Sequence, residues 1–420
     1  MEFKQSLYDV VIIGAGPAGA TAAALLAQAG KSVLVLERQH FPRFSIGESL
    51  LPQCMAFLDE AGLLERVVKH ADELGFQFKD GAAFYHNGEH VNFDFQKKSS
   101  VGPGTTYQVK RERFDKLLIE GAAEFGAEVY HGLTVQAVNF DNADYVSVTV
   151  EHDADGQQYH IKGRYLLDAS GFGRVLPRLL DLEYPSDFPV RQAAFCHVKT
   201  DLTGGRFDRQ KILITTHPDE PEIWFWTIPF ADGTASLGVV GGVEFFAHNK
   251  DAKDALWQRV NEEPYLRKVL GDCEVTRPEQ FITGYSANVR TLYGDRFALL
   301  GNAGEFLDPV FSSGVTIAMK SSSIAVPLVI RELNGEQVDW ENEYSARLRK
   351  GISTFHTFVK GWYDTRFQDV IYFKQQHPEV KAMICSILAG YAWDESNPYV
   401  RESERRLGVL AELCQPVSPE

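Results

Sequence analysis

The sequence is poor in cysteine and in basic residues. Five widely spaced cysteines among 420 residues form no CxxC pair, and no histidines have metal-ligand spacing, which argues against a disulfide framework or a zinc site. Lys and Arg number 42 against 57 Asp and Glu, for a net charge of −15. Such a charge repels phosphate backbones and anionic headgroups. We therefore expect no nucleic-acid partner and a reducing, cytoplasmic location.

Long uncharged runs are also scarce. Residues 10–30 form one, and on length alone they could span a membrane. Three glycines and a proline interrupt this run, and an acidic residue precedes it where a signal peptide would be basic. The pattern instead predicts a strand, a turn and a helix. No later stretch is long and apolar enough to span, so we expect no membrane span.

The turn in VVIIGAGPAGA has the GxGxxG spacing, with glycines at Gly14, Gly16 and Gly19. The first suits a tight turn, the second a close approach to a pyrophosphate, and the third close packing of helix on strand. A second strand, SVLVLER, ends in Glu37, where an acidic side chain accepts hydrogen bonds from ribose hydroxyls. The alternative is a glycine-rich turn without a ligand. NAD and FAD share this unit, so it does not choose between them.

A second glycine-containing loop follows near the far end of the chain. The strand-like RFALLGNAG leads through EFLDPVFSSGV into a helix of small residues. Two such loops suit a long ligand held at both ends, which favours FAD over a nicotinamide cofactor that must come and go. An ordinary turn is the alternative interpretation.

These segments, together with FPRFSIGESLLP, YQVKRERFDKLL, LLDASGFG and WFWTIPF, resemble the flavin-dependent halogenases. The likeness is to the branch acting on pyrroles, phenols and carrier-tethered acyl groups, within the wider flavoprotein monooxygenase and geranylgeranyl reductase fold, and it covers about the first 340 residues. It implies an α/β fold, in which a Rossmann-like FAD-binding domain is interleaved with a mainly antiparallel β-sheet substrate domain and followed by a C-terminal helical region. The expected boundaries are 1–75, 105–178 and 284–338 for the FAD domain, 76–104 and 179–283 for the sheet domain, and 339–420 for the helical region.

The resemblance also implies a chemistry. Reduced FAD from a separate flavin reductase reacts with oxygen to give a hydroperoxide, which halide attacks to give hypohalous acid. This oxidant moves through a tunnel to a lysine, here Lys79 in GFQFKDGAAF, while a tryptophan pair, here Trp224 and Trp226, keeps the substrate from the flavin. The alternatives are that Lys79 is a solvated or packing residue and that the tryptophans reflect plain strand alternation.

The remaining site residues come from the same likeness. It places halide on the turn of Ser312, Ser313 and Gly314, where N-capping by a serine is a compatible alternative. Asn302 replaces the family's aspartate, and Phe311 stands where the tryptophan-specific branch has glutamate, so free tryptophan is a poor substrate candidate. The expected FAD residues are Gly14, Ala15, Gly16, Pro17, Ala18, Gly19, Glu37, Arg38, Arg43, Ser49, Arg111, Val135, Gly171, Gly301, Asn302, Asp308 and Gly314.

We therefore predict an FAD-dependent, halogenase-like oxidoreductase of secondary metabolism, acting on an aromatic or polyene substrate tethered to an acyl carrier protein. One alternative is a non-halogenating FAD oxidase, dehydrogenase or hydroxylase of the same fold in pigment biosynthesis. Another is a flavoprotein that matures or binds a partner protein through its C-terminal aromatic stripe. That stripe, between residues 355 and 373, is more typical of a helical core.

Overall fold

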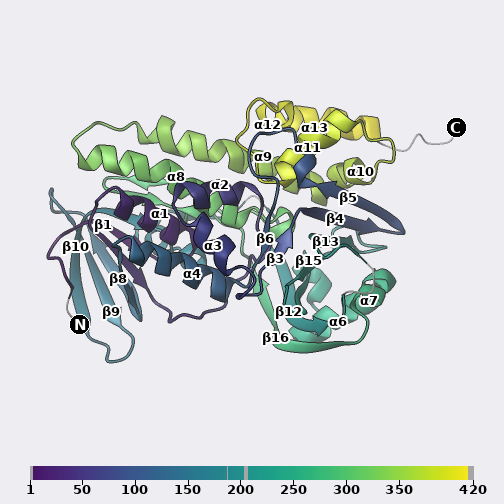
Figure 1. The fold of residues 1–420 in the computed structure, drawn as a ribbon, viewed down its shortest axis with the longest axis horizontal. Coiled ribbons are helices and arrows are strands. Elements are labelled where there is room, and N and C mark those ends of the chain that lie inside the picture. Colours follow the sequence, from purple (N-terminus) through teal and green to yellow (C-terminus); the bar gives the residue numbers. More distant parts are fainter. Residues whose placement is uncertain (1–2, 187, 203–206, 415–420) are drawn as a thin grey trace.

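The computed structural model describes residues 3–186, 188–202 and 207–414 (Figure 1). The ends of the predicted FAD domain and helical region, at 1–2 and 415–420, lie outside the described residues, as do 187 and 203–206 of the predicted sheet domain.

The first sheet has eight strands, of which the central ones are parallel. Its core strand β1 is a nearly fully buried run of Val and Ile, as expected for a strand covered on both faces. The path is β18-β19-β10-β1-β2-β7, and β8 and β9 continue from β10 as an antiparallel extension. The strands are β1 (Tyr8–Ile13), β2 (Val33–Glu37), β7 (Glu128–His131), β8 (Leu133–Asn139), β9 (Val146–His152), β10 (Gln158–Asp168), β18 (Tyr293–Gly294) and β19 (Phe297–Leu299).

Helices α1 (Pro17–Gln28), α4 (Arg111–Glu124) and α8 (Gly314–Leu333) lie together beside this sheet (Figure 1). The expectation that no later stretch could span a membrane was wrong for α8, which is long and apolar enough by length and composition. However, 67% of its most apolar window is buried inside the protein, and it packs against α1. Its apolar character is that of a core helix.

The second sheet has seven strands in the order β16-β12-β15-β14-β13-β4-β5, antiparallel except between β13 and β4. Two small two-stranded sheets, β3–β6 and β11–β17, flank it in sequence. The strands are β3 (Gln77–Lys79), β4 (Gly81–His86), β5 (Glu89–Asp94), β6 (Thr106–Gln108), β11 (Glu183–Tyr184), β12 (Arg191–Thr200), β13 (Lys211–Thr216), β14 (Trp224–Pro229), β15 (Thr234–Gly242), β16 (Cys273–Thr283) and β17 (Asn288–Val289).

Helices cover this sheet from two sides (Figure 1). Helices α6 and α7 lie over a small core that includes Phe225, while Trp224 and Trp226 point to the opposite face, into the large core. The C-terminal helices lie beyond β4 and β5, and the aromatic stripe predicted as core is mostly buried there. The remaining helices are α2 (Gln53–Glu60), α3 (Leu64–His70), α5 (Val175–Leu179), α6 (Ala252–Glu262), α7 (Pro264–Leu270), α9 (Ala346–Tyr363), α10 (Arg366–Tyr372), α11 (Pro378–Leu388), α12 (Pro398–Arg401) and α13 (Ser403–Cys414).

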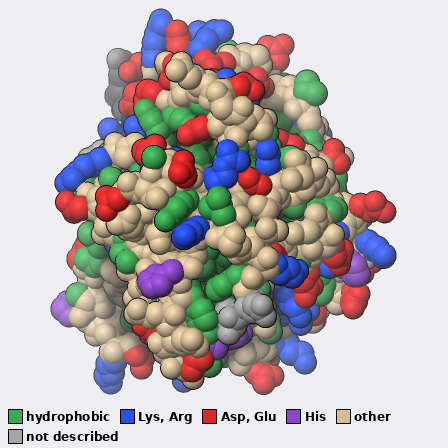
Figure 2. Space-filling model, turned by 90° about the vertical axis from the view of Figure 1, so that its left-hand side faces the viewer, with side chains coloured by type: hydrophobic (Ala, Val, Ile, Leu, Met, Phe, Trp, Pro, Cys, Tyr) green, Lys and Arg blue, Asp and Glu red, His purple; other side chains and the backbone are tan. Residues whose placement is uncertain are grey.

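These layers confirm the predicted α/β class, with a Rossmann-like sheet, a mainly antiparallel sheet and C-terminal helices. The second sheet takes β4 and β5 from within 76–104 and its other strands from within 179–283. The domain boundaries themselves stay a prediction. Figure 2 shows the face at the β8–β9 end, where acidic and basic side chains lie interspersed with apolar ones.

Candidate functional site

A cavity of about 460 Å³ is lined by residues of both large sheets. The first sheet contributes the turn after β1 and the end of β2, and the second contributes β12 to β16. Its lining also includes the loop before α8 and residues 43–49 of the segment 41–52, which we call the strap. The cavity thus lies where the carboxyl ends of the parallel strands meet the antiparallel sheet, a typical place for a ligand in open α/β folds.

The three glycines of the first turn have different surroundings. Gly14 has φ of +99°, and a Cβ there would lie 2.5 Å from the carbonyl oxygen of Ala169. A Cβ on Gly19 would overlap the carbonyl oxygen of Gly14, so helix and strand pack directly. A Cβ on Gly16 would meet nothing closer than Arg43, at 3.6 Å. Gly16 therefore lines the cavity, and a Cβ there would touch Arg43 without overlapping any atom.

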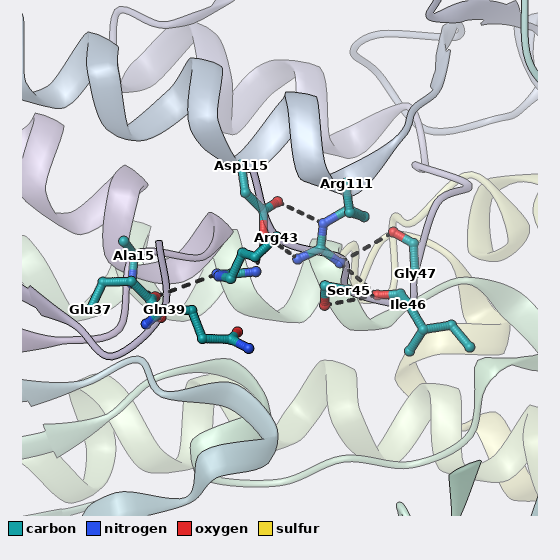
Figure 3. A network of polar contacts seen from close by, with 9 residues as sticks. All are labelled: Ala15, Glu37, Gln39, Arg43, Ser45, Ile46, Gly47, Arg111 and Asp115. Atoms are coloured by element: carbon teal, nitrogen blue, oxygen red, sulfur yellow. Dashed lines mark hydrogen bonds and ion pairs between the residues drawn. The ribbon is translucent and has the colours of Figure 1, made fainter. Parts of the chain in front are cut away.

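Glu37 ends β2 and is 5% exposed. Its carboxylate accepts hydrogen bonds from the backbone N–H groups of Ala15 and Gln39, both at 2.9 Å (Figure 3). Each carboxylate oxygen retains a further lone pair. The side chain is therefore fixed in the cavity wall and can still accept from a hydroxyl group of a ligand.

A buried carboxylate holds two arginines of the cavity wall (Figure 3). Asp115 of α4 is fully buried and accepts from Arg111 through both oxygens, at 2.7 and 2.9 Å. Arg43 of the strap donates to the same carboxylate at 3.2 Å and lies 3.5 Å from Glu37. Arg111 also donates to the backbone oxygens of the strap residues Ile46 and Gly47. This network fixes the strap against α4.

The loop between β19 and α8, residues 300–313, forms a further part of the cavity wall. Gly301 has φ of +55°, and a Cβ there would lie 2.9 Å from the backbone of Ala318. Asn302, Ser312 and Gly314 line the cavity. Ser313 is the N-cap of α8 but makes no side-chain capping bond, so the capping expected for a serine here is not seen at Ser313.

Trp224 and Trp226 both line the cavity, with ring centroids 5.9 Å apart. The indole N–H of Trp226 donates to Ser236, and that of Trp224 donates to the hydroxyl of Tyr363, at 3.1 and 3.0 Å. A Cβ on Gly238 would overlap the ring of Trp226. Each indole is thus held by a hydroxyl group, and of the two partners Ser236 itself lines the cavity whereas Tyr363 lies behind its wall.

Lys79 is fully buried at the end of β3 and does not line the cavity. Its ammonium nitrogen lies 2.7 Å from Ser49 Oγ and 2.7 Å from the carbonyl oxygen of Leu50. Ser49 does line the cavity. Burial lowers the pKa of Lys79 to about 7. The expectation that Lys79 could be a solvated surface residue was therefore wrong.

A further titratable pair borders the cavity. Glu48 of the strap lines it and lies 3.0 Å from Nε2 of His197 on β12. Both side chains are buried. Burial raises the pKa of Asp308 to about 6, but this carboxylate does not line the cavity.

The predicted residues divide by their place relative to this cavity. Those that line it are Gly14, Gly16, Pro17, Ala18, Glu37, Arg38, Arg43, Ser49, Arg111, Gly171, Trp224, Trp226, Asn302, Ser312 and Gly314. Those that do not are Ala15, Gly19, Lys79, Val135, Gly301, Asp308 and Ser313. Val135 lies on β8.

Sequence reasoning missed Asp115 and the Glu48–His197 pair. Arg111 and Asp115 are four residues apart in RERFD, the spacing at which side chains on a helix meet, so this ion pair had a local signal. Glu48 and His197 are 149 residues apart, and only the fold brings them together.

The residues fit FAD. Glu37 can accept from the ribose of an adenosine, the Gly16 backbone in the cavity lining suits a pyrophosphate, and the cavity lining at Asn302, Ser312 and Gly314 leaves room for the flavin end. Arg43 supplies a cation beside Gly16, and its buried Nε has no hydrogen-bond partner among the described residues, which suits an anionic group. Among the described residues no cluster of His, Cys, Asp or Glu could hold a metal ion.

Comparisons with known proteins agree. The FAD binding domain family matches residues 7–340. A 1H-pyrrole-2-carbonyl-[peptidyl-carrier protein] chlorinase of Pseudomonas fluorescens is 29% identical, over 96% of this chain and 94% of its own. A flavoprotein/dehydrogenase from Cytophaga hutchinsonii is 40% identical with a TM-score of 0.92, over 97% and 99% of the two chains. The flavin-dependent brominase Bmp2 is 25% identical with a TM-score of 0.83, over 97% and 100%.

The family match covers most of the chain, and the relatives align with it over nearly its full length. The protein is an FAD-dependent, halogenase-like oxidoreductase of the monooxygenase type. The chain belongs to the FAD-binding family of flavin-dependent halogenases.

Proposed function

We propose that the protein halogenates an aromatic or polyene acyl substrate while that substrate is tethered to a carrier protein. The observation that carries this proposal is a fully buried amine, Lys79, one hydrogen bond behind the cavity wall at Ser49. The carrier-tethered substrate is supported by the names of relatives that act on 1H-pyrrole-2-carbonyl-[peptidyl-carrier protein], one a chlorinase and one a brominase.

Bound FAD, reduced by a separate flavin reductase, supplies the oxidation: reduced FAD, O2, halide and a proton give oxidised FAD, hypohalous acid and water. The chain's part is to hold the halide and to keep the substrate away. Ser312 and Gly314 bring the N-terminus of α8 to the cavity, and N–H groups there suit a monovalent anion. Trp224 and Trp226 form the wall that keeps the acyl substrate from the flavin.

The geometry of Lys79 suits an amine that accepts halogen. A neutral amine has two N–H donors and one lone pair, and the structure provides two acceptors, Ser49 Oγ and the Leu50 carbonyl, at 2.7 Å each. Both hydrogens are then bonded and the lone pair is free. Because burial lowers the pKa of Lys79 to about 7, a large fraction of the amine is neutral under physiological conditions.

The halogen passes from hypohalous acid to the substrate in two steps. The lone pair of Lys79 takes the halogen from hypohalous acid, the halogen–oxygen bond breaks, and water leaves with a proton from the nitrogen. The nitrogen–halogen bond then breaks as the halogen passes to a substrate carbon. The nitrogen keeps that electron pair and takes up the proton that the carbon loses.

The rival function is a non-halogenating FAD oxidase or dehydrogenase. The name of the Cytophaga hutchinsonii relative, a flavoprotein/dehydrogenase, favours it. In that case Lys79 and the tryptophans pack the site, and halide has no effect on the product. Both functions suit the cytoplasmic location inferred from composition.

Halide dependence decides between the two. FAD-loaded protein, a flavin reductase with NADH, and a carrier-bound aromatic acyl thioester are assayed by mass spectrometry with chloride, with bromide and with neither. We expect halide-dependent mass shifts, and their absence from every aromatic and polyene substrate offered would favour the rival.

Lys79 variants test the mechanism. We expect Lys79→Ala to abolish halogenated product while flavin reoxidation by oxygen continues. Lys79→Arg should not rescue, because a guanidinium stays protonated. The control is Lys211→Arg, at a buried lysine paired with Asp80 and Asp208 outside the cavity lining, which should retain product. Wild-type product from Lys79→Ala would remove the lysine from the mechanism.

A further inference from the structure

A hydrogen-bonded chain runs behind the cavity wall through three distant segments. Trp224 Nε1, on β14, donates to the hydroxyl of Tyr363 at 3.0 Å. That hydroxyl, at the end of α9, donates to Asp308 Oδ2 at 2.9 Å. The function proposed above uses Trp224 but gives no role to Tyr363 or Asp308.

One end of this hydrogen-bonded chain lines the cavity, and the other end begins a loop that lines it. The indole of Trp224 is part of the lining. Asp308 opens the loop whose later members Pro309, Ser312 and Gly314 also line it, and its Oδ1 accepts from the backbone N–H of Val310 at 3.0 Å. A change at the Asp308 carboxylate therefore acts on the loop directly and on the indole through Tyr363.

The charges around Asp308 come from each neighbouring element. Tyr285, after β16, has its hydroxyl 3.5 Å from Oδ2. Arg191, at the start of β12, stacks its guanidinium 3.3 Å from the ring centroid of Tyr363 and pairs with the partly exposed Glu222 at 3.6 Å. No lysine or arginine among the described residues makes an ion pair with Asp308 itself.

The polarity of the chain depends on the Asp308 proton. When the carboxylate is ionised, every donor points one way, from the indole to the phenol and from the phenol to Oδ2. When Oδ2 is protonated, its hydrogen and the phenol hydrogen of Tyr363 would both lie between the same two oxygen atoms. The hydrogen bond from Tyr363 to Asp308 is therefore lost or reversed. Burial raises the pKa of Asp308 to about 6, and it raises the pKa of Tyr363 well above its usual value. The phenol therefore stays protonated while Asp308 titrates.

We propose that Tyr363 is a positioning residue that fixes the indole of Trp224 in the cavity wall. Protonation of Asp308 changes the hydrogen bonds of Tyr363, and this change shifts the indole relative to the bound flavin. The proposal goes beyond halogenation and does not depend on it. It requires only FAD in the cavity that Trp224 lines.

Flavin fluorescence tests this without turnover, because a nearby indole quenches an excited flavin according to its position. FAD-loaded wild-type protein is titrated across the pH range on either side of 6, with circular dichroism at each pH to show that the fold is intact. We expect a step in flavin fluorescence with its midpoint near pH 6. Asp308→Asn should remove this step, since the amide does not titrate.

Tyr363→Phe separates transmission from a direct effect of the charge. It keeps the ring beneath Arg191 but removes both hydrogen bonds, so the step should be lost although Asp308 still titrates. The matched control is Tyr372→Phe, which removes a hydroxyl bonded to Thr216 on the adjacent strand β13 and should retain the step. Tyr363→Phe also stands as the test if Asp308→Asn does not fold.

Four outcomes would overturn the proposal. They are a wild-type titration without a step, a step that survives Tyr363→Phe, a step that Tyr372→Phe removes equally, and a step that survives Asp308→Asn and so belongs to another group. Because no substrate or halide is present, failure here leaves the proposed halogenation to be decided by its own assay.

Discussion

Lys79 and Ser49 are joined by a hydrogen bond of 2.7 Å that connects a fully buried amine to the wall of the FAD cavity. The two residues come from different segments, since Lys79 ends β3 and Ser49 belongs to the strap, where it also forms a β-bridge with Gln108. Ser49 is thus a direct hydrogen-bonded link between this amine and the cavity lining. Since both acceptors of the amine, Ser49 and Leu50, belong to the strap, a shift of the strap would change both contacts.

The buried amine gives a stability prediction with a defined sign. Burial lowers the pKa of Lys79 from 10.5 to about 7, so the unfolded chain binds a proton at this site more strongly than the folded chain does. Burial of Lys79 therefore lowers the free energy of unfolding most below about pH 7, and this penalty falls as pH rises from about 7 toward 10.5. Relative to Lys79→Met, the wild type should gain roughly 2 kcal/mol of unfolding free energy between about pH 6 and about pH 8.5.

Urea unfolding of both proteins at the two pH values measures this difference. The control variant is Lys211→Met, at a lysine whose pKa is raised by Asp208 and Asp80 against the effect of burial. Relative to this variant, the wild type should not gain the same unfolding free energy between the two pH values. An equal pH dependence in wild type and Lys79→Met would mean that the folded lysine titrates normally.

Gly16→Val should give a colourless protein. A Cβ at Gly16 would touch Arg43 at an ordinary contact distance of 3.6 Å without overlap, so the apoprotein accommodates the side chain, whereas the pyrophosphate of FAD can no longer approach the backbone there. The flavin absorbance per protein after purification measures occupancy. The control is Gly408→Val on α13, where a Cβ meets nothing within 4 Å and which does not line the cavity. Full FAD occupancy in Gly16→Val would contradict the assigned site.

Asp115→Asn should loosen the strap. The substitution preserves shape but leaves two arginines facing one another without their carboxylate, and breaking a buried ion pair costs about 3–5 kcal/mol. We expect a loss of that order in unfolding free energy and weaker FAD binding by equilibrium dialysis. Asp232→Asn breaks a partly exposed pair with Lys110 beside the same helix and should cost about 1 kcal/mol or less. Similar losses in both variants would show that Asp115 has no special role.

NADPH alone should not bleach the flavin at a useful rate. The described residues contain one glycine-rich strand–turn–helix unit of the dinucleotide-binding kind, and FAD requires it. Stopped-flow absorbance under nitrogen, with and without a flavin reductase, distinguishes the two cases. Rapid stoichiometric bleaching by NADPH alone would favour the dehydrogenase function.

The local parts of the site could be predicted from the sequence. The β1 turn, α1 and the acidic end of β2 lie within the first 37 residues, where spacing alone defines their contacts. The strand alternation at Trp224 and Trp226 correctly predicts that both share one face. Which face borders the cavity depends on how the two sheets meet, and no local pattern contains that information.

The contacts that position these groups could not be predicted in the same way. Asp308 was expected at the cofactor, yet its carboxylate accepts from Tyr363, 55 residues later in the chain. The sequence context predicts a role for Lys79 but not its burial, which accompanies the contacts of its nitrogen with Ser49 and Leu50 of the strap. Such contacts arise from tertiary packing, which hydrophobic periodicity does not encode.

The ring of Trp226 occupies the space that a side chain at position 238 would need, so the absence of a Cβ at Gly238 helps to set the shape of the cavity wall. The indole packs directly against the Gly238 backbone, and the size of the residue at this position determines how far the indole extends into the cavity. A single methyl group added there would push the ring forward and narrow the chamber without altering any residue that a ligand touches. Chains of this family that differ at this strand position should therefore differ in the size of molecule they admit, even where their lining residues are identical.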